Sequence, residues 1–123
     1  MKNKKLINSF KYAFSGIVTA FKSEKNMKIH FTMMMLVIIF GILLKISLNE
    51  WLVCIMLFCM VIGSEMINTA VENVVNLAMP TKNEVAKNAK DISAGAVLVF
   101  AIGSAIIGLI IFIPKIINIL VNL

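Results

Sequence analysis

Five polar side chains recur along one apolar stretch, and two of them are carboxylates. They are Glu65, Asn68, Thr69, Glu72 and Asn76. A helix turns by about 100° per residue, so the five positions fall within about 100° of arc on one face. A charged side chain in mid-membrane costs about 2.5–3.5 kcal/mol on insertion scales and marks a candidate functional site. The alternative, that these groups only hydrogen-bond between packed helices, fits Asn68 and Thr69 better than the glutamates.

The elements that must position this stripe are those of a membrane protein. Of 123 residues, 60% are hydrophobic and 15% charged, whereas soluble domains have about 45–50% and about 25%. We therefore expect residues 1–123 to form one all-α integral membrane domain. Apolar segments predict transmembrane helices at about residues 29–48, 51–79 and 92–114. Apolar side chains at three- and four-residue steps predict an amphipathic surface helix at about residues 5–26.

The lysines orient these helices. The chain has twelve lysines and no arginine, and seven of the lysines lie in the first thirty residues. Segment 80–91 carries three more. The positive-inside rule then places the N-terminus and segment 80–91 in the cytoplasm, in a multi-pass protein of the plasma membrane. A basic set made only of lysine argues against a nucleic-acid partner, because base recognition favours arginine.

Depth in the membrane indicates the kind of chemistry. Counted from Trp51, Glu65 lies about 21 Å and Glu72 about 31 Å along a helix, so Glu72 is near the inner edge of a core about 30 Å thick. Lys90 and Asp91 are expected to begin the next helix at that boundary, with Asp91 at or near its cap. Glu24 lies on the same side. Several acids and a lysine at one level suit a divalent cation and phosphates better than conduction across the bilayer.

These residues also carry a resemblance. Residues 65–75, Glu-Met-Ile-Asn-Thr-Ala-Val-Glu-Asn-Val-Val, resemble the ExxNTAxExxxD core of the small prokaryotic diacylglycerol kinase family, in particular its Gram-positive undecaprenol kinase branch. Further matches follow in family order over about residues 10–110. They are Ala-Phe-Lys-Ser-Glu-Lys-Asn at 20–26, Ile29-His30, Glu50-Trp51, Ala-Lys-Asp at 89–91 and Ala-Gly-Ala-Val-Leu at 94–98.

The resemblance implies an integral-membrane lipid kinase with three transmembrane helices per chain and a surface helix. It implies a homotrimer with active sites between protomers. Such an enzyme transfers the γ-phosphoryl group of ATP to a lipid alcohol, with Mg²⁺ as cofactor. The branch favours undecaprenol as substrate, and diacylglycerol is the alternative.

Roles for individual residues follow from their places in the family pattern. Glu65 would be the general base, and Asn68 would orient Glu65 or the lipid. Glu24 and Glu72 would bind the Mg²⁺ that bridges the phosphates of ATP. Three further residues would contact the nucleotide. Lys90 would contact a phosphate, Asp91 would hydrogen-bond the nucleotide, and Tyr12 would line the nucleotide side from the surface helix.

Two residues and one rival function complete the predictions. The family pattern has an acid four residues after Glu72, and Asn76 in its place is expected to weaken metal or nucleotide affinity if that acid serves binding. A lone interfacial histidine without a second ligand, such as His30, is interpreted as structural. The rival to a kinase is a small proton- or cation-coupled transporter that uses Glu65 as its carrier site, but polar residues in the outer half of the apolar segments are few.

Overall fold

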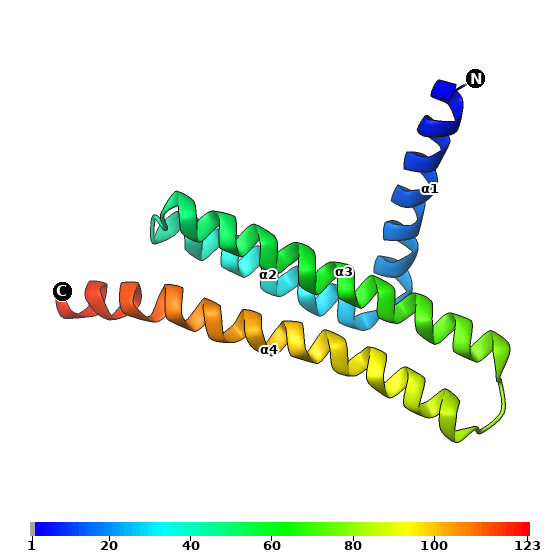
Figure 1. Ribbon diagram of the computed structural model, residues 1–123. Coiled ribbons are helices and arrows are strands. Elements are labelled where there is room, and N and C mark those ends of the chain that lie inside the picture. The colour runs from blue at the N-terminus through cyan, green and yellow to red at the C-terminus, as the bar shows by residue number, and fades with distance from the viewer. Residues whose placement is uncertain (1) are drawn as a thin grey trace.

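The computed structural model describes residues 2–123 and folds them into α-helices, with no strand in that range. The helices are α1 (Lys2–Ser23), α2 (Lys25–Leu43), α3 (Leu48–Ala78) and α4 (Glu84–Val121). Helices α2, α3 and α4 are each long and apolar enough to cross a membrane. They run side by side, whereas α1 projects away from them (Figure 1). The prediction of an all-α protein with three candidate transmembrane helices is confirmed.

The three apolar helices differ in length. At 1.5 Å per residue, the 19 residues of α2 span about 28 Å, close to a hydrocarbon core of about 30 Å. The 31 residues of α3 and the 38 of α4 span about 46 Å and about 57 Å. Both helices therefore extend beyond the hydrocarbon core, and polar side chains near their ends can meet water.

The turn between α2 and α3 is fixed by local contacts. Ser47 and Glu50 form a capping box: the Glu50 N–H donates to Ser47 Oγ at 3.2 Å and the Ser47 N–H donates to Glu50 Oε1 at 2.9 Å. Lys115 of α4 lies with its Nζ 3.0 Å from Glu50 Oε1, which ties α4 to the same turn. Gly41 is required here, because a Cβ would lie 2.7 Å from Cη2 of Trp51.

The start of α4 corrects one prediction. Asn83 is its N-cap, and Asn83 Oδ1 accepts from the Ala86 N–H at 3.0 Å. Helix α4 therefore begins at Glu84, two turns before Lys90 and Asp91, and Asp91 is not a cap. The apolar pattern starts only at Ile92, but capping and helix-forming residues start the helix without it. At its other end α4 also continues past Pro114 to Val121.

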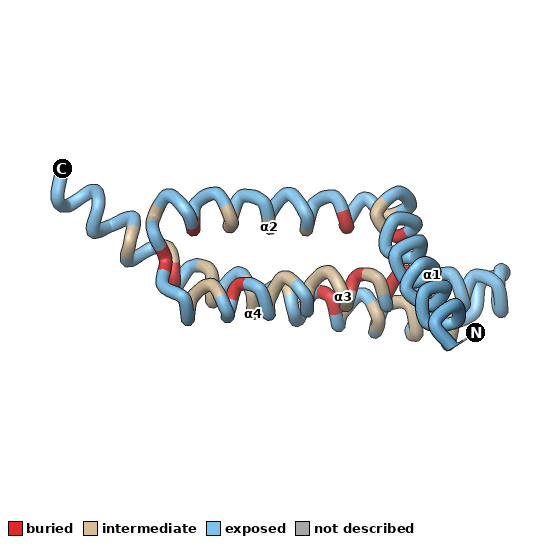
Figure 2. The backbone as a smooth tube through the Cα atoms, turned by 90° about the horizontal axis from the view of Figure 1, so that it is seen from above, coloured by how far each residue is buried: buried red, intermediate tan, exposed pale blue. Residues whose placement is uncertain are grey.

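Few residues are buried within the single chain, and they are spread over the four helices and the turn between α2 and α3 (Figure 2). The buried apolar residues are few: Ala20, Met27, Ile46, Cys54, Val97 and Ile111. The buried polar residues are Glu65, Asn68 and Thr69, all on α3. Large apolar side chains are exposed along all four helices, including Phe10 and Phe14 of α1. Exposed apolar surface of this extent is typical of contact with lipid or with other subunits.

Helix α3 organises the bundle. It packs along α4 and, less extensively, along α2, and α1 contacts only α2 and α3. In the described part of the chain the backbones of α2 and α4 do not pack on each other. Helix α3 therefore contacts each of the other three helices, and its side chains can meet groups from all of them.

Candidate active site

Glu65 is the most deeply buried ionisable group on this face of α3, at 1% exposure. Its Oε2 lies 3.4 Å from Nε2 of His30, which comes from α2. Its Oε1 is buried and has no hydrogen-bond partner. An unpaired buried carboxylate oxygen is costly unless a donor reaches it. Glu65 therefore has one oxygen held by a protein group and one free to accept a proton or a hydrogen bond.

The neighbouring polar residues bond along α3. Thr69 Oγ1 donates to the Glu65 carbonyl at 2.9 Å, and Asn68 Nδ2 donates to Glu72 Oε1 at 3.4 Å. Neither side chain bonds to another helix within residues 2–123, so this chain gives no support for the alternative of polar contact between helices. Asn68 was expected to orient Glu65 or the lipid, whereas its amide contacts Glu72 and its buried Oδ1 has no partner.

Glu24 reaches the same region from a different element. It is the residue between α1 and α2, in extended conformation (φ −113°, ψ 120°), and its side chain makes no capping bond. Partial burial, followed by the nearby charges of Glu72 and Glu65, raises the pKa of Glu24 above its usual range. The fold thus brings three carboxylates close enough to repel one another, and a cation between them would relieve that repulsion.

The three acids do not form a closed metal cage. No group of three or more His, Cys, Asp or Glu side chains within residues 2–123 has the geometry to hold a metal ion. Mg²⁺ needs no such cage, because it keeps several waters and usually binds through one or two carboxylates plus substrate phosphates. Glu24 and Glu72 are a donor set of that kind. Their chemistry fits a Mg²⁺ ion that arrives with a nucleotide.

Beyond Glu72, the face of α3 opens into a hollow of about 840 Å³ at the α3–α4 connection, which we call the lysine hollow. Its charged and amide-bearing lining residues are Asn76, Lys82, Asn83, Glu84, Lys87, Lys90 and Asp91. The structure therefore brings the predicted Lys90 and Asp91 together with Asn76. Lys87 Nζ pairs with Asp91 Oδ2 at 2.6 Å. Three lysines in one hollow suit the phosphates of a nucleotide.

Lys82 and Lys87 were missed as site residues by sequence reasoning. The two lysines were used only to orient the membrane spans. Their position in the same short segment as Lys90 could have identified them as candidates for phosphate contact. Tyr12 was predicted to line the nucleotide side. It is 71% exposed on α1, which projects from the bundle (Figure 1), and it does not line the lysine hollow.

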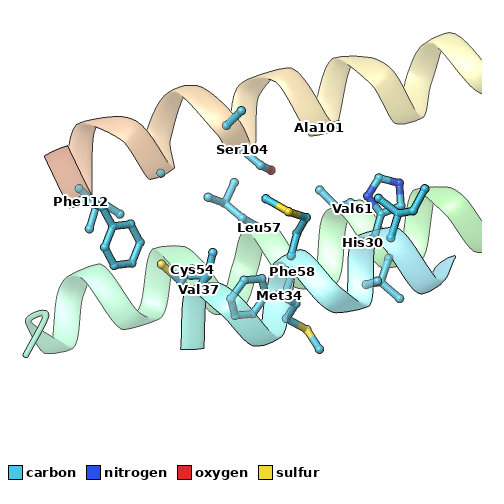
Figure 3. A pocket seen from close by; sticks show the side chains of 16 residues that line it. His30, Met34, Val37, Cys54, Leu57, Phe58, Val61, Ala101, Ser104 and Phe112 are labelled. Carbon is cyan, nitrogen blue, oxygen red and sulfur yellow. The ribbon is translucent and has the colours of Figure 1, made fainter. Parts of the chain in front are cut away.

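In the opposite direction along α3 lies an apolar cavity of about 330 Å³, between α2, α3 and α4. His30 lies near one end of this cavity and Phe112 near the other (Figure 3). The buried Ser104 hydroxyl has no partner and points into the space. His30 therefore lines the apolar cavity and also contacts Glu65, which does not itself line the cavity.

One face of α3 thus passes from apolar to acidic to basic surroundings. Its residues recur at three- and four-residue steps: Cys54, Phe58 and Val61 at the cavity, then Glu65, Asn68 and Glu72, then Asn76 at the lysine hollow. Two carboxylates thus lie between an apolar cavity and a hollow with three lysines, an arrangement suited to chemistry between an apolar and a phosphate-bearing molecule.

Comparison with known proteins identifies the class more closely. The model of the family "Prokaryotic diacylglycerol kinase" matches residues 11–112. The chain is 40% identical over 111 residues to the undecaprenol kinase of Bacillus subtilis, with 90% of each chain covered. It is 37% identical over 117 residues to the diacylglycerol kinase of Synechocystis sp., with 94% of this chain and 67% of that protein covered.

The chain belongs to the prokaryotic diacylglycerol kinase family. It is a membrane protein and a lipid kinase. The resemblance of residues 65–75 to this family is confirmed. The comparisons favour the kinase over the alternative of a transporter.

Proposed function

We propose that the protein phosphorylates undecaprenol, with ATP as phosphate donor and Mg²⁺ as cofactor, at the cytoplasmic face of the membrane. The observation that carries this proposal is the continuous face of α3, on which Glu65 and Glu72 lie between the apolar cavity and the lysine hollow. Similarity to the undecaprenol kinase over 90% of both chains supports this acceptor, and diacylglycerol is the alternative.

In the proposed reaction Glu65 is the general base. Its unpaired Oε1 accepts the proton of the lipid hydroxyl as the hydroxyl oxygen bonds to the γ-phosphorus and the bond to the β-phosphate oxygen breaks. The products are the lipid monophosphate and ADP. Burial of Glu65 excludes water, which otherwise competes with the lipid alcohol for the phosphoryl group.

Glu24 and Glu72 would hold Mg²⁺. Bound there, the ion neutralises charge on the phosphates, which is what phosphoryl transfer chiefly requires. Asn68 positions the Glu72 carboxylate through its amide. Lys90 contacts phosphate within the lysine hollow, Asp91 hydrogen-bonds the nucleotide, and Tyr12 contributes from α1. Asp91 is paired with Lys87 in this structure, so Asp91 must give up that ion pair to bond with the nucleotide.

The orientation and assembly belong to the same proposal. The lysine-rich N-terminus and the lysine hollow lie in the cytoplasm, with α1 on the membrane surface, because lysines concentrate at these two places. The functional unit is a homotrimer with sites completed between protomers. Support comes from the unpaired buried atoms of Glu65 and Asn68 and from the apolar surface that one chain leaves exposed.

A side-by-side assay tests the acceptor. Purified protein in nanodiscs is given ATP and Mg²⁺ with equal amounts of undecaprenol or diacylglycerol, and lipid phosphate is measured. We expect kcat/KM for undecaprenol to exceed that for diacylglycerol at least about tenfold, the smallest effect expected from a pocket that distinguishes substrates by apolar contact. Equal values, or preference for diacylglycerol, would contradict undecaprenol as the substrate and leave the kinase reaction standing.

The apolar cavity is proposed to hold the part of the lipid tail next to the hydroxyl, because His30 lines the cavity and contacts Glu65. Ala101→Leu fills part of it, and we expect KM for the lipid to rise about tenfold with KM for ATP unchanged. Ala96→Leu is the matched control, since it adds the same bulk to α4 at an exposed position outside the cavity. Equal KM values for the two variants would place the tail elsewhere.

A further inference from the structure

His30 of α2 contacts the buried Glu65 of α3. We propose that His30 is a positioning residue for Glu65: the ring holds Oε2 of the carboxylate, so that Oε1 faces the lipid hydroxyl. This inference rests on the proposed role of Glu65 as general base. It assigns a function to a histidine whose sequence context indicated only a structural one.

The contact itself joins two helices. His30 Nε2 on α2 lies 3.4 Å from Glu65 Oε2 on α3, and the two side chains are 19% and 1% exposed. The distance exceeds that of a formed N–H···O hydrogen bond, and catalytic contacts are often long before substrate binds and tightens them. A proton on Nε2 would let the ring donate to Oε2 once the contact shortens, which would leave Oε1 as the free oxygen.

No other described side chain can take this part. Within residues 2–123 no lysine lies within 4.0 Å of the Glu65 carboxylate. Thr69 donates to the Glu65 main-chain carbonyl instead of its carboxylate, and the Asn68 amide is bonded to Glu72. Glu24 and Glu72 are acids and repel Glu65. The orientation of the carboxylate therefore depends on His30.

The position of the apolar cavity explains why the orientation of the Glu65 carboxylate matters. His30 lines the cavity (Figure 3). It also contacts Glu65. A lipid whose tail occupies the cavity must bring its hydroxyl past the imidazole ring to reach the carboxylate. With Oε2 already occupied by His30, the remaining acceptor is the unpaired Oε1. The histidine thus separates the space for the tail from the proton acceptor and selects the oxygen that the hydroxyl meets.

Two substitutions at position 30 separate positioning from packing. His30→Leu keeps the bulk at the cavity but cannot donate a hydrogen bond, whereas His30→Gln places an amide donor at similar reach. We expect His30→Leu to lower kcat about 10- to 100-fold, as for loss of one hydrogen bond to a charged group, with KM for ATP unchanged. His30→Gln is expected to recover most of that loss. Similar kcat losses in both variants would contradict the proposal, as would wild-type kcat in His30→Leu.

A double variant shows whether His30 acts through Glu65. If it does, adding His30→Leu to Glu65→Gln lowers the residual turnover no further, because the proton acceptor that His30 positions is already gone. A full additional loss would overturn the proposal. Its failure is distinct from failure of the proposed function: in the first case the wild type phosphorylates a lipid alcohol and only the His30 results disagree, and in the second the wild type phosphorylates neither lipid.

Discussion

Glu65→Gln is expected to lower turnover about a thousandfold, within the range that general bases contribute. The amide keeps the size of the side chain and its contact with His30, but it cannot accept the hydroxyl proton. KM for ATP should change little, because the phosphates are held by other residues. Lipid phosphate formed from saturating ATP, Mg²⁺ and undecaprenol measures the effect.

Stability separates this loss from misfolding. Glutamine removes a buried carboxylate whose Oε1 has no partner, so the thermal midpoint of the detergent-solubilised variant should not fall below that of the wild type. Wild-type turnover in Glu65→Gln would remove Glu65 as the base.

Glu72→Gln is expected to show the second large effect, of a different kind. Removing one of the two proposed Mg²⁺ ligands should reduce kcat/KM for ATP about a hundredfold or more at a low Mg²⁺ concentration. Part of this loss should return as Mg²⁺ is raised, since the metal then binds more weakly but still binds. The loss in Glu65→Gln should not respond to Mg²⁺, and Mg²⁺ titrations of both variants make the comparison.

The reverse pattern would reassign the residues. A Mg²⁺-responsive loss in Glu65→Gln and an unresponsive one in Glu72→Gln would place the metal at Glu65. Glu24 offers a supporting measurement. Because Glu72 helps to raise the pKa of Glu24 by repulsion, Glu72→Gln should lower that pKa toward its ordinary value.

Much of this arrangement follows from the order of residues along the chain. The periodicity of Glu65, Asn68 and Glu72 predicts a single polar face, and α3 buries Glu65, Asn68 and Thr69 as one set. The apolar segments predict three long helices, which the fold contains. The polar periodicity and the apolar segments both depend on residues that are close together in the sequence. Both can therefore be recognised from the sequence alone.

What sequence reasoning missed depends on packing between elements. The contact of His30 with Glu65 requires the register of α2 against α3, which no local pattern supplies. Asn68 was expected to orient Glu65 or the lipid; the contact of its amide with Glu72, one turn further along α3, was not foreseen. The start of α4 was misplaced for another reason: the apolar pattern marks where a helix enters the membrane, whereas capping by Asn83 marks where it begins.

The lysine hollow shows the same limit. Lys82 and Lys87 were visible as basic residues, but their convergence with Lys90 depends on how the connection between α3 and α4 folds back. Asn76 lines that hollow in place of the acid that the family pattern carries. The hollow is consequently more basic than the pattern suggests, which suits phosphate contact even where metal affinity is reduced.

Transfer of labelled phosphate from the γ-position of ATP tests the central claim most directly. The wild type, Glu65→Gln and Glu72→Gln proteins are incubated in nanodiscs with undecaprenol, and label is counted in the lipid fraction and in free phosphate. The acidic face of α3 predicts label in undecaprenyl phosphate for the wild type, very little for either variant, and little free phosphate throughout. Label released only as free phosphate, or equal lipid labelling by all three proteins, would contradict it.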